Sequence, residues 1–371
     1  MKQGWEIKKL GEVCEIQTGK LDANAKVENG AYPFYTCDSQ PYRIDTYAFD
    51  DEAILISGNG SQVGHINYYK GKFNAYQRTY VLTGFNTFYI PYLIQYLKGF
   101  LRPYIMENKK GGCIPYITLP ILKNFTIAHP PREVQEQIVS ELDLLSGIIE
   151  KKREQLKELD ALAQSIFYDM FGDPITNEKG WEVKKLGEVC DDITDGDHMP
   201  PPKSEIGIPF LTISNIDKEK RELNFNDTFF VTEEYYDNIK ENRKAKRGDV
   251  LYTVTGSYGI PVIVNTDKHF CFQRHIALLK PTQETLLPIF LCHWFLCDGV
   301  KFIADQVATG IAQKTVSLTS IRKFEIILPP LPLQHQFASK IEAIERQKEL
   351  IKQSISETET LFNARMQHYF G

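Results

Sequence analysis

Residues 4–14 read GWEIKKLGEVC and residues 180–190 read GWEVKKLGEVC, so an eleven-residue stretch occurs twice in this chain with a single Ile-to-Val difference. Chance does not produce a match of this length and quality. The two stretches lie 176 positions apart, which indicates two copies of one folded unit. The length of 371 residues also exceeds that of one ordinary domain, so two domains are expected.

A second pair of matching segments closes each copy. Residues 130–145 read PPREVQEQIVSELDLL and residues 329–344 read PPLPLQHQFASKIEAI, and this match continues without a gap to residues 172 and 371. Its offset is 199 rather than 176, so the second copy holds 23 additional residues in its middle. The sequence therefore predicts two units with similar ends and different middles. A duplication without functional meaning is the alternative interpretation.

The closing segment of each copy has the periodicity of a long helix. Apolar side chains recur in alternating steps of four and three residues, which is the heptad pattern of a coiled coil. Pro-Pro pairs at 130 and 329 fix an extended entry, and Gly172 and Gly371 stand where C-terminal helix caps belong. The predicted seam of the helix pair comprises Ile138, Leu142, Leu145, Ile149, Leu156, Leu159, Ile166, Phe337, Ile341, Ile344, Ile351, Ile355 and Phe362.

These two helices are expected to pack against one another in antiparallel orientation, because the domain between them lets the chain reverse direction. About 36 residues at a rise of 1.5 Å make each helix roughly 54 Å long. The pair would then act as a spacer between two globular heads. Packing of each helix only on its own domain, or on a helix of a partner protein, is the alternative.

The middles combine strand and helix signals. Residues 53–56, 79–82, 249–254 and 261–264 are typical of strands, and residues 91–100 and 288–303 are typical of helices. The fold class is therefore α+β: two similar α/β heads separated and joined by two long antiparallel coiled-coil helices, with a pseudo-two-fold internal repeat. The expected limits are a first head at 1–129, a first spacer helix at 130–172, a linker at 173–179, a second head at 180–328 and a second spacer helix at 329–371.

The composition is that of a soluble globular protein, with 42% hydrophobic and 25% charged residues. No apolar run reaches the roughly 18 residues that a bilayer requires, and the N-terminal sequence lacks the order of a secretory signal, so we expect the protein in the cytoplasm. The net charge of -5 argues against an overall basic coat for nucleic acid. Any DNA-binding charge must therefore be local, or partners must supply part of it.

A search for catalytic motifs gives no catalytic residue, no metal site and no cofactor of the chain's own. The seven cysteines and eight histidines show no metal-ligand spacing. Residues 58–64 (GNGSQVG) lack the helix start and distal acid of a dinucleotide site, and we interpret them as a tight turn after a strand, like residues 255–259. The base-gripping motif of an amino-group DNA methyltransferase and the phosphate loop of a helicase motor are both absent from the sequence.

Polar and basic residues among aromatic ones in the middles are the candidates for DNA contact, since Arg pairs with guanine, Asn or Gln pairs with adenine, and Lys binds phosphate. In the first head they are Asn59, Ser61, Gln62, His65, Tyr68, Tyr69, Lys70, Gln77, Arg78, Lys109 and Lys110. In the second head they are His198, Lys203, Ser257, Tyr258, Gln273, Arg274, His275 and Lys314. A Gln-Arg pair recurs in both copies, so it is read as a structural or backbone-gripping feature.

The whole chain resembles the specificity subunits of type I restriction-modification enzymes. The resemblance rests on a duplicated order: GWE[IV]KKLGEV, a variable domain, a Gly-containing stretch ending in Leu, Pro-Pro, Gln-x-Gln and a long helix. Within the middles, residues 195–198 (DGDH), 247–251 (RGDVL) and 272–275 (FQRH) look like one subtype of target recognition domain. Residues 32–36 (YPFYT), 57–60 (SGNG) and 76–79 (YQRT) look like another.

The resemblance implies that each head reads one half of a bipartite, asymmetric DNA site and that the helix pair sets the gap between the halves. It also implies partners: double-stranded DNA, two methyltransferase subunits that use S-adenosylmethionine, and restriction subunits that use ATP and Mg. The chain itself would be a non-catalytic specificity subunit. A scaffold whose heads bind protein partners instead of DNA, and an enzyme with an unrecognised site, are the rival functions.

Overall fold

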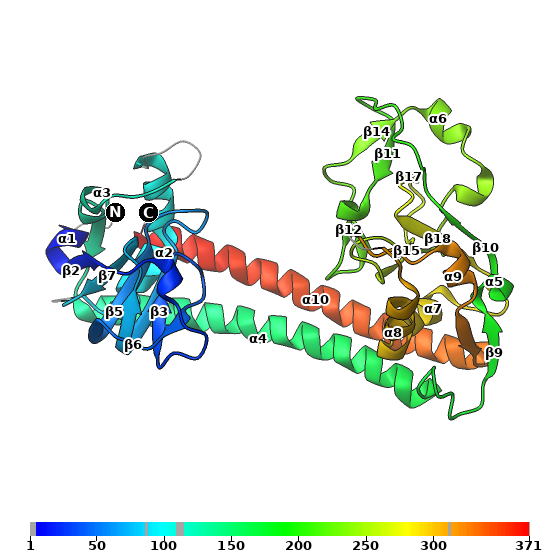
Figure 1. The fold of residues 1–371 in the computed structure, drawn as a ribbon, viewed down its shortest axis with the longest axis horizontal. Helices are drawn as coiled ribbons and strands as arrows, with labels where there is room; N and C mark the ends of the chain where they lie inside the picture. Colours follow the sequence, from blue (N-terminus) through cyan, green and yellow to red (C-terminus); the bar gives the residue numbers. More distant parts are fainter. Residues whose placement is uncertain (1–4, 86–87, 109–114, 311–312, 371) are drawn as a thin grey trace. The chain divides into compact units, whose positions relative to one another are not determined.

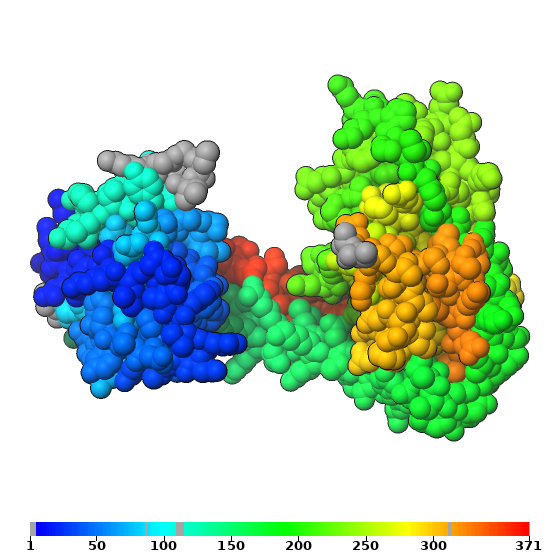
Figure 2. Space-filling view, viewed as in Figure 1, coloured from blue at the N-terminus to red at the C-terminus, as the bar shows by residue number. Residues whose placement is uncertain are grey.

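The computed structural model describes residues 5–85, 88–108, 115–310 and 313–370. The chain divides into two compact units: unit 1 contains residues 1–153 and 353–371, and unit 2 contains residues 154–352. Each unit holds one head, formed by its own run of sequence (Figure 2). The helices α4 (Arg132–Phe171) and α10 (Leu331–Phe370) each give one part to each unit (Figure 1). The domain limits that we expect from the sequence separate heads from helices instead, and they stay a prediction.

The head of unit 1 is built on a six-stranded sheet in the order β2-β7-β5-β6-β3-β4. All neighbouring strands are antiparallel except the parallel pair β3 and β6. A short 3-10 helix, η1 (Ala23–Ala25), follows β2. The strands are β2 (Glu15–Thr18), β3 (Tyr32–Tyr35), β4 (Tyr42–Ile44), β5 (Phe49–Ser57), β6 (Ile66–Ala75) and β7 (Thr79–Thr83).

Strand β5 has consecutive apolar residues instead of alternating apolar and polar residues, because both faces of the sheet are covered at this strand. Ile54 and Ile56 join the core beneath α2 (Ile90–Asn108), together with Tyr92 and Leu97 of that helix. The intervening Leu55 belongs to a second cluster on the other face. Both faces are covered, so consecutive side chains are buried.

The head of unit 2 contains a four-stranded sheet in the order β10-β18-β15-β16, a three-stranded sheet in the order β14-β11-β17, and the hairpin β12-β13. Strand β11 pairs in parallel with β17, as β3 does with β6. The strands are β10 (Cys190–Asp195), β11 (Ile208–Leu211), β12 (Ile216–Asp217), β13 (Glu222–Leu223), β14 (Phe229–Val231), β15 (Val250–Thr253), β16 (Pro261–Ile263), β17 (Cys271–Phe272) and β18 (Ile276–Pro281).

The helix expected at residues 288–303 is divided into α7 (Pro288–Phe295) and α8 (Asp298–Val307). The break falls at Cys297, whose backbone is extended, and a glycine follows two residues later, where it lowers helix propensity. The other short helices of unit 2 are η2 (Ile213–Asn215), α6 (Glu233–Asp237), η3 (Glu241–Arg243) and α9 (Leu318–Arg322).

The duplicated GWE segment forms the same small element in both units. In unit 1, β1 (Glu6–Lys9) pairs with β8 (Thr126–His129), and in unit 2, β9 (Glu182–Lys185) pairs with β19 (Glu325–Leu328). One short helix follows the first strand of each pair: α1 (Leu10–Val13) in unit 1 and α5 (Leu186–Val189) in unit 2. Each of them buries its first Leu and its last Val. In unit 1, α3 (Leu119–Lys123) packs against α1.

The two long helices begin with the same hydrogen-bonded device. The buried side chain of Gln135 donates to the O of Pro130 at 2.9 Å, and that of Gln334 donates to the O of Pro329 at 2.9 Å. At the other end, Gly172 has a φ of +75° and donates its N–H to Tyr168, so the predicted cap of α4 is confirmed. Gly371 lies outside the described residues.

Within each unit, α4 and α10 run antiparallel, as predicted. In unit 1, Glu141 accepts a hydrogen bond from Tyr369, and farther along α4, Arg153 pairs with Glu359 at 2.7 Å. In unit 2, Asp160 of α4 pairs with Lys348 of α10 at 3.0 Å, and farther along α4, Phe171 packs against Phe337. The α10 numbers fall as the α4 numbers rise, which is the antiparallel order.

The predicted seam positions are all buried or half-buried. The buried ones are Ile138, Leu142, Leu145, Ile149, Phe337, Ile341 and Ile344. Of these, Ile138, Leu142, Phe337, Ile341 and Ile344 also join the core of the adjacent head. The half-buried ones are Leu156, Leu159, Ile166, Ile351, Ile355 and Phe362. Each helix therefore packs on its own head and on the other helix. Among the described residues, no helix has the length and apolar character needed to cross a bilayer.

Candidate nucleic-acid interface

Four chain segments meet at one end of the central strands of unit 2, and we call them the tip of that head. They are residues 196–198, 254–259, 273–276 and 313–317. Backbone hydrogen bonds from N–H to O join them: Arg274 to Asp197 at 3.0 Å, Val254 to His275 at 2.9 Å and Gly256 to Lys314 at 3.0 Å. The main-chain frame of the tip is therefore fixed independently of its outward side chains.

A cavity of about 360 Å³ opens on the tip of unit 2. Three residues that the sequence predicts as DNA contacts, His198, Arg274 and His275, line it from two different segments. The other lining residues are Asp195, Val254, Thr255, Gln313, Thr315, Val316, Ser317 and Leu318. The structure thus gathers donors and acceptors of several kinds around one hollow.

A second cavity of about 590 Å³ shares Asp195 and His198 with the first. Asp195 accepts from the guanidinium of Arg243 at 3.2 Å and lies 2.9 Å from the His198 ring nitrogen Nε2. Tyr235 and Asp197 also line this cavity. The shared wall makes the two hollows neighbours on one polar surface, and Arg243 balances part of its acidic charge.

The head of unit 1 has an equivalent tip, formed by residues 19–22, 58–64, 76–79 and 115–117. Its backbone hydrogen bonds repeat those of unit 2: Gln77 to Leu21 at 2.9 Å, Gly58 to Arg78 at 2.9 Å and Gly60 to Pro115 at 3.1 Å. The predicted turns after β5 and β15 are confirmed, since Gly64 bonds back to Ser57 at 2.8 Å and Gly259 to Thr253 at 3.0 Å.

The two Gln-Arg pairs do not occupy the same place in the two tips. The turn in unit 1 is closed by the N–H of Thr79 on Tyr76 at 2.8 Å, and the turn in unit 2 by the N–H of Ile276 on Gln273 at 3.1 Å. Tyr76 therefore matches Gln273, and the two dipeptides are shifted by one residue. Their recurrence in the sequence is not a shared structural position.

A glycine supports the turn in each tip because a side chain has no space there. A Cβ added at Gly19 would lie 1.8 Å from the carbonyl O of Ala75, and a Cβ at Gly196 would lie 1.9 Å from that of Phe272. These distances are far below van der Waals contact. The close approach of backbone to backbone thus requires glycine at both positions.

Other predicted residues of unit 1 lie away from the turn. Tyr68 donates to Glu52 at 2.5 Å, Lys70 pairs with Glu52 at 3.7 Å, and Tyr69 packs on aromatic rings of the sheet. The hydrogen bond to Glu52 raises the pKa of Tyr68. In the loop after β5, Asn59 and His65 are half-buried, and Ser61 and Gln62 are exposed. Lys109 and Lys110 lie outside the described residues.

In unit 2, several predicted residues are held by neighbours. Ser257 accepts from Lys218 at 2.6 Å, and Tyr258 donates to Asp305 at 2.6 Å, which raises the pKa of Tyr258. Lys203 lies over the Phe229 ring at 5.0 Å. Lys314 is exposed in the last tip segment. Sequence reasoning did not single out Arg243, because it lies in a run of charges that looks like ordinary surface.

His275 and Arg274 are coupled within the turn of unit 2. Burial, and then the positive charge of Arg274, lower the pKa of His275. The ring is therefore neutral near pH 7, and its Nε2 lies 3.5 Å from the Nε of Arg274. A neutral imidazole can accept from the guanidinium without charge repulsion.

Residues 2–160 and 178–360 match the family described as type I restriction modification DNA specificity domain. The chain belongs to this family. The EcoDI specificity subunit of Escherichia coli is 26% identical over 95% of this chain and 84% of its own length. A putative specificity subunit of Haemophilus influenzae is 22% identical over 91% and 90%, respectively.

Solved structures support the same fold. The type I S subunit from M. genitalium has a TM-score of 0.56 and 14% identity over 100% of this chain and 98% of its own. A chain from a study of assembly and conformational transition of the type I R-M system has a TM-score of 0.62 and 19% identity, covering 99% and 97%. The specificity-family fold, with two heads and long helices, therefore extends over the whole chain.

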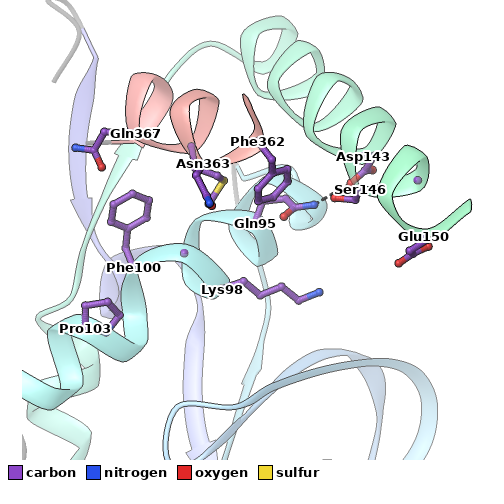
Figure 3. Close-up of a pocket in the computed structure, with 13 residues that line it drawn as sticks. Gln95, Lys98, Phe100, Pro103, Asp143, Ser146, Glu150, Phe362, Asn363 and Gln367 are labelled. Atoms are coloured by element: carbon purple, nitrogen blue, oxygen red, sulfur yellow. Dashed lines mark hydrogen bonds between the residues drawn. The ribbon is translucent and has the colours of Figure 1, made fainter. Parts of the chain in front are cut away.

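A cavity of about 1000 Å³ lies in unit 1 between α2, α4 and α10 (Figure 3). Gln95 of α2 donates to Asp143 of α4 at 2.8 Å across it, and Phe362 enters from α10. The described residues that line it include none of the predicted DNA contacts. Among the described residues, no cluster of His, Cys, Asp or Glu is placed to hold a metal.

Proposed function

We propose that this chain is the DNA-specificity subunit of a type I restriction-modification complex, in which each head reads one half of a bipartite, asymmetric site. The observation that carries the proposal is the pair of tips: one backbone frame occurs in both heads and presents different polar side chains in each. A shared frame suits a shared ligand, and different side chains suit different base sequences.

The side chains of the tips have the chemistry of base readout. Arg donates two hydrogen bonds to guanine, Gln pairs with adenine, and His and Thr offer single contacts in the major groove. The cavity that holds His198, Arg274 and His275 is open and is lined by both polar and apolar side chains. This favours contact with the edges of bases over enclosure of a small molecule.

The negative net charge of the chain is consistent with a DNA-binding subunit whose partners make part of the contacts with the phosphates. The net charge is -5, so phosphate neutralisation by this chain alone would be weak. We propose that two methyltransferase subunits, which use S-adenosylmethionine, supply much of it, and that restriction subunits using ATP and Mg complete the complex. The chain would have no catalytic role and would act in the cytoplasm.

We propose that the paired helices set the number of unspecified bases between the half-sites. Each helix has 40 residues. The salt bridges and hydrogen bonds between the helices within each unit would make the pair stiffer than a single helix. Stiffness is what a spacer between two reading heads requires.

The proposal is tested by sequencing the methylated bases of cells that express the chain with its methyltransferase subunit. We expect one bipartite motif with unequal halves. Replacing residues 15–128 with the matching part of another family member should change one half and leave the other intact. A change in both halves, or an unchanged motif in a complex that still methylates DNA, would contradict the proposal.

The scaffold alternative is not favoured, because the family that covers both halves of the chain is described by DNA specificity. A direct comparison is the salt dependence of DNA binding by the complex. Specific binding should weaken steeply between 50 and about 200 mM salt, because bound counterions are released from the phosphates. A complex that binds random and cognate DNA equally at every salt concentration would favour the scaffold.

A further inference from the structure

The turn of each tip carries different residues at equivalent positions. In the turn at residues 76–79 the first central residue is Gln77, and in the turn at residues 273–276 it is Arg274. Both side chains are exposed, and both N–H groups are bonded to the segment after the first strand of the sheet. The backbone is therefore the same, and only the chemistry of the exposed side chain differs.

The neighbours of these two residues also correspond. Gln77 bonds to the O of Leu21, and Arg274 to the O of Asp197, so the next residues, Asp22 and His198, are equivalent. The Gln77 amide nitrogen lies 3.5 Å from the Asp22 carboxylate, a long contact that is easily exchanged. Arg274 lines the same cavity as His198.

We infer that this turn position selects one base in each half-site, with Gln77 contacting an adenine and Arg274 contacting a guanine. The inference rests on the proposed function and goes beyond it by naming the residue and the base in each head. An exposed Gln offers one donor and one acceptor for adenine, and an exposed Arg offers two parallel donors for guanine.

Arg274 lines the tip cavity of unit 2 from an exposed position. The Nε of Arg274 makes a long hydrogen bond of 3.5 Å to the ring nitrogen of His275, and this contact uses neither of the two terminal guanidinium nitrogens. Among the described residues, no carboxylate forms an ion pair with Arg274. The fork that recognises guanine is thus not already occupied.

The test uses the complex of the full chain with its methyltransferase subunit, and the methylated motif is read from genomic DNA. Arg274→Gln should lower methylation of the original motif roughly 10- to 100-fold and relax a single G·C position, or shift it to A·T, in one half-site. Gln77→Arg should alter a single A·T position in the other half-site. In each variant the unaltered half serves as an internal control.

Arg247→Gln is the matched control for lost charge, because Arg247 is exposed in the same head and pairs with Asp267 outside the tip. It should leave every motif position unchanged. Copurification with the methyltransferase subunit and circular dichroism check that all variants fold and assemble.

A uniform loss of methylation with an unchanged motif would overturn the inference, because it would assign the position to phosphate binding. A change at a position other than the stated base pair, or in both halves at once, would overturn it too. Wild-type cells that contain both subunits but show no bipartite motif would instead contradict the proposed function itself.

Discussion

The side chain of Gln135 accepts a hydrogen bond from the backbone N–H of Tyr89 at 2.8 Å, and so ties the start of α4 to the start of α2. Gln334 makes the same bond to Leu287 at 2.9 Å in the other unit. These bonds explain why the first Gln of each Gln-x-Gln motif is buried. One side chain satisfies backbone groups that the helix starts would otherwise leave unpaired.

Replacement of either buried glutamine should therefore destabilise the chain. Gln135→Ala leaves the half-buried N–H of Tyr89 and the buried O of Pro130 without their partner, at a cost of about 1–3 kcal/mol in the free energy of unfolding. The matched control is Gln137→Ala, since Gln137 is exposed two residues later in the same motif. Urea unfolding checks both, and equal effects of the two variants would show that the buried bond is not the cause.

The glycines beneath the tips should resist replacement more than other glycines. Gly19→Ala or Gly196→Ala would place a Cβ within 2 Å of a backbone carbonyl, so the turn must shift. We expect a lower melting temperature and weaker DNA binding. Gly147→Ala is the control, because it lies in α4 with no atom near the added Cβ. It should raise helix stability by up to about 1 kcal/mol.

The repeated ends and the helix pair could be predicted from the sequence because their signals are local. The GWE segment and the heptad seam are patterns within one stretch of chain, and they correspond to β1, β9, α4 and α10. The parallel pairing of Tyr35 with Ala75, and of Leu211 with Phe272, could not be predicted. It joins short strands across a long stretch of sequence, and no periodicity reports it.

The residue types of the candidate site could be predicted from the sequence, but the places of these residues in the two turns could not. Arg274, His275 and His198 were expected from their chemistry, and the structure places them around one cavity. The sequence match of Gln77-Arg78 with Gln273-Arg274 is not a structural match. The backbone hydrogen bonds place Gln77, and not Arg78, at the position of Arg274. Only the hydrogen bonds of the turns give the register.

Buried His293 should make unfolding sensitive to acid. Burial, and then the charges of Arg221 and Lys348, lower its pKa from 6.5 to about 3. Below pH 6.5 the unfolded chain binds a proton that the folded chain excludes, so stability is present above pH 6.5 and is lost as the pH falls. The loss should approach about 1.4 kcal/mol for each pH unit.

The effect of His293 is best measured between pH 6.5 and about 5, before most carboxylates titrate. His293→Leu should flatten the dependence of unfolding free energy on pH in this window. His335→Leu, at an exposed position of α10, should keep the wild-type slope. A wild-type slope in the His293 variant would assign the acid sensitivity to other groups.

Lengthening both long helices together should lengthen or disrupt the gap in the DNA site without altering the half-site preference. Seven added residues extend a helix by about 10.5 Å, which is close to three base pairs, and nearly restore the facing of the seam because they make almost two turns. We expect a longer gap, or loss of methylation, with both half-sites retained. An insertion in α4 alone, placed between residues 153 and 160, puts the pairing of Asp160 with Lys348 out of register with that of Arg153 with Glu359, so it should lower stability. The methylated motif checks the first result and urea unfolding the second, and altered half-sites with an unaltered gap would show that helix length does not set the spacing.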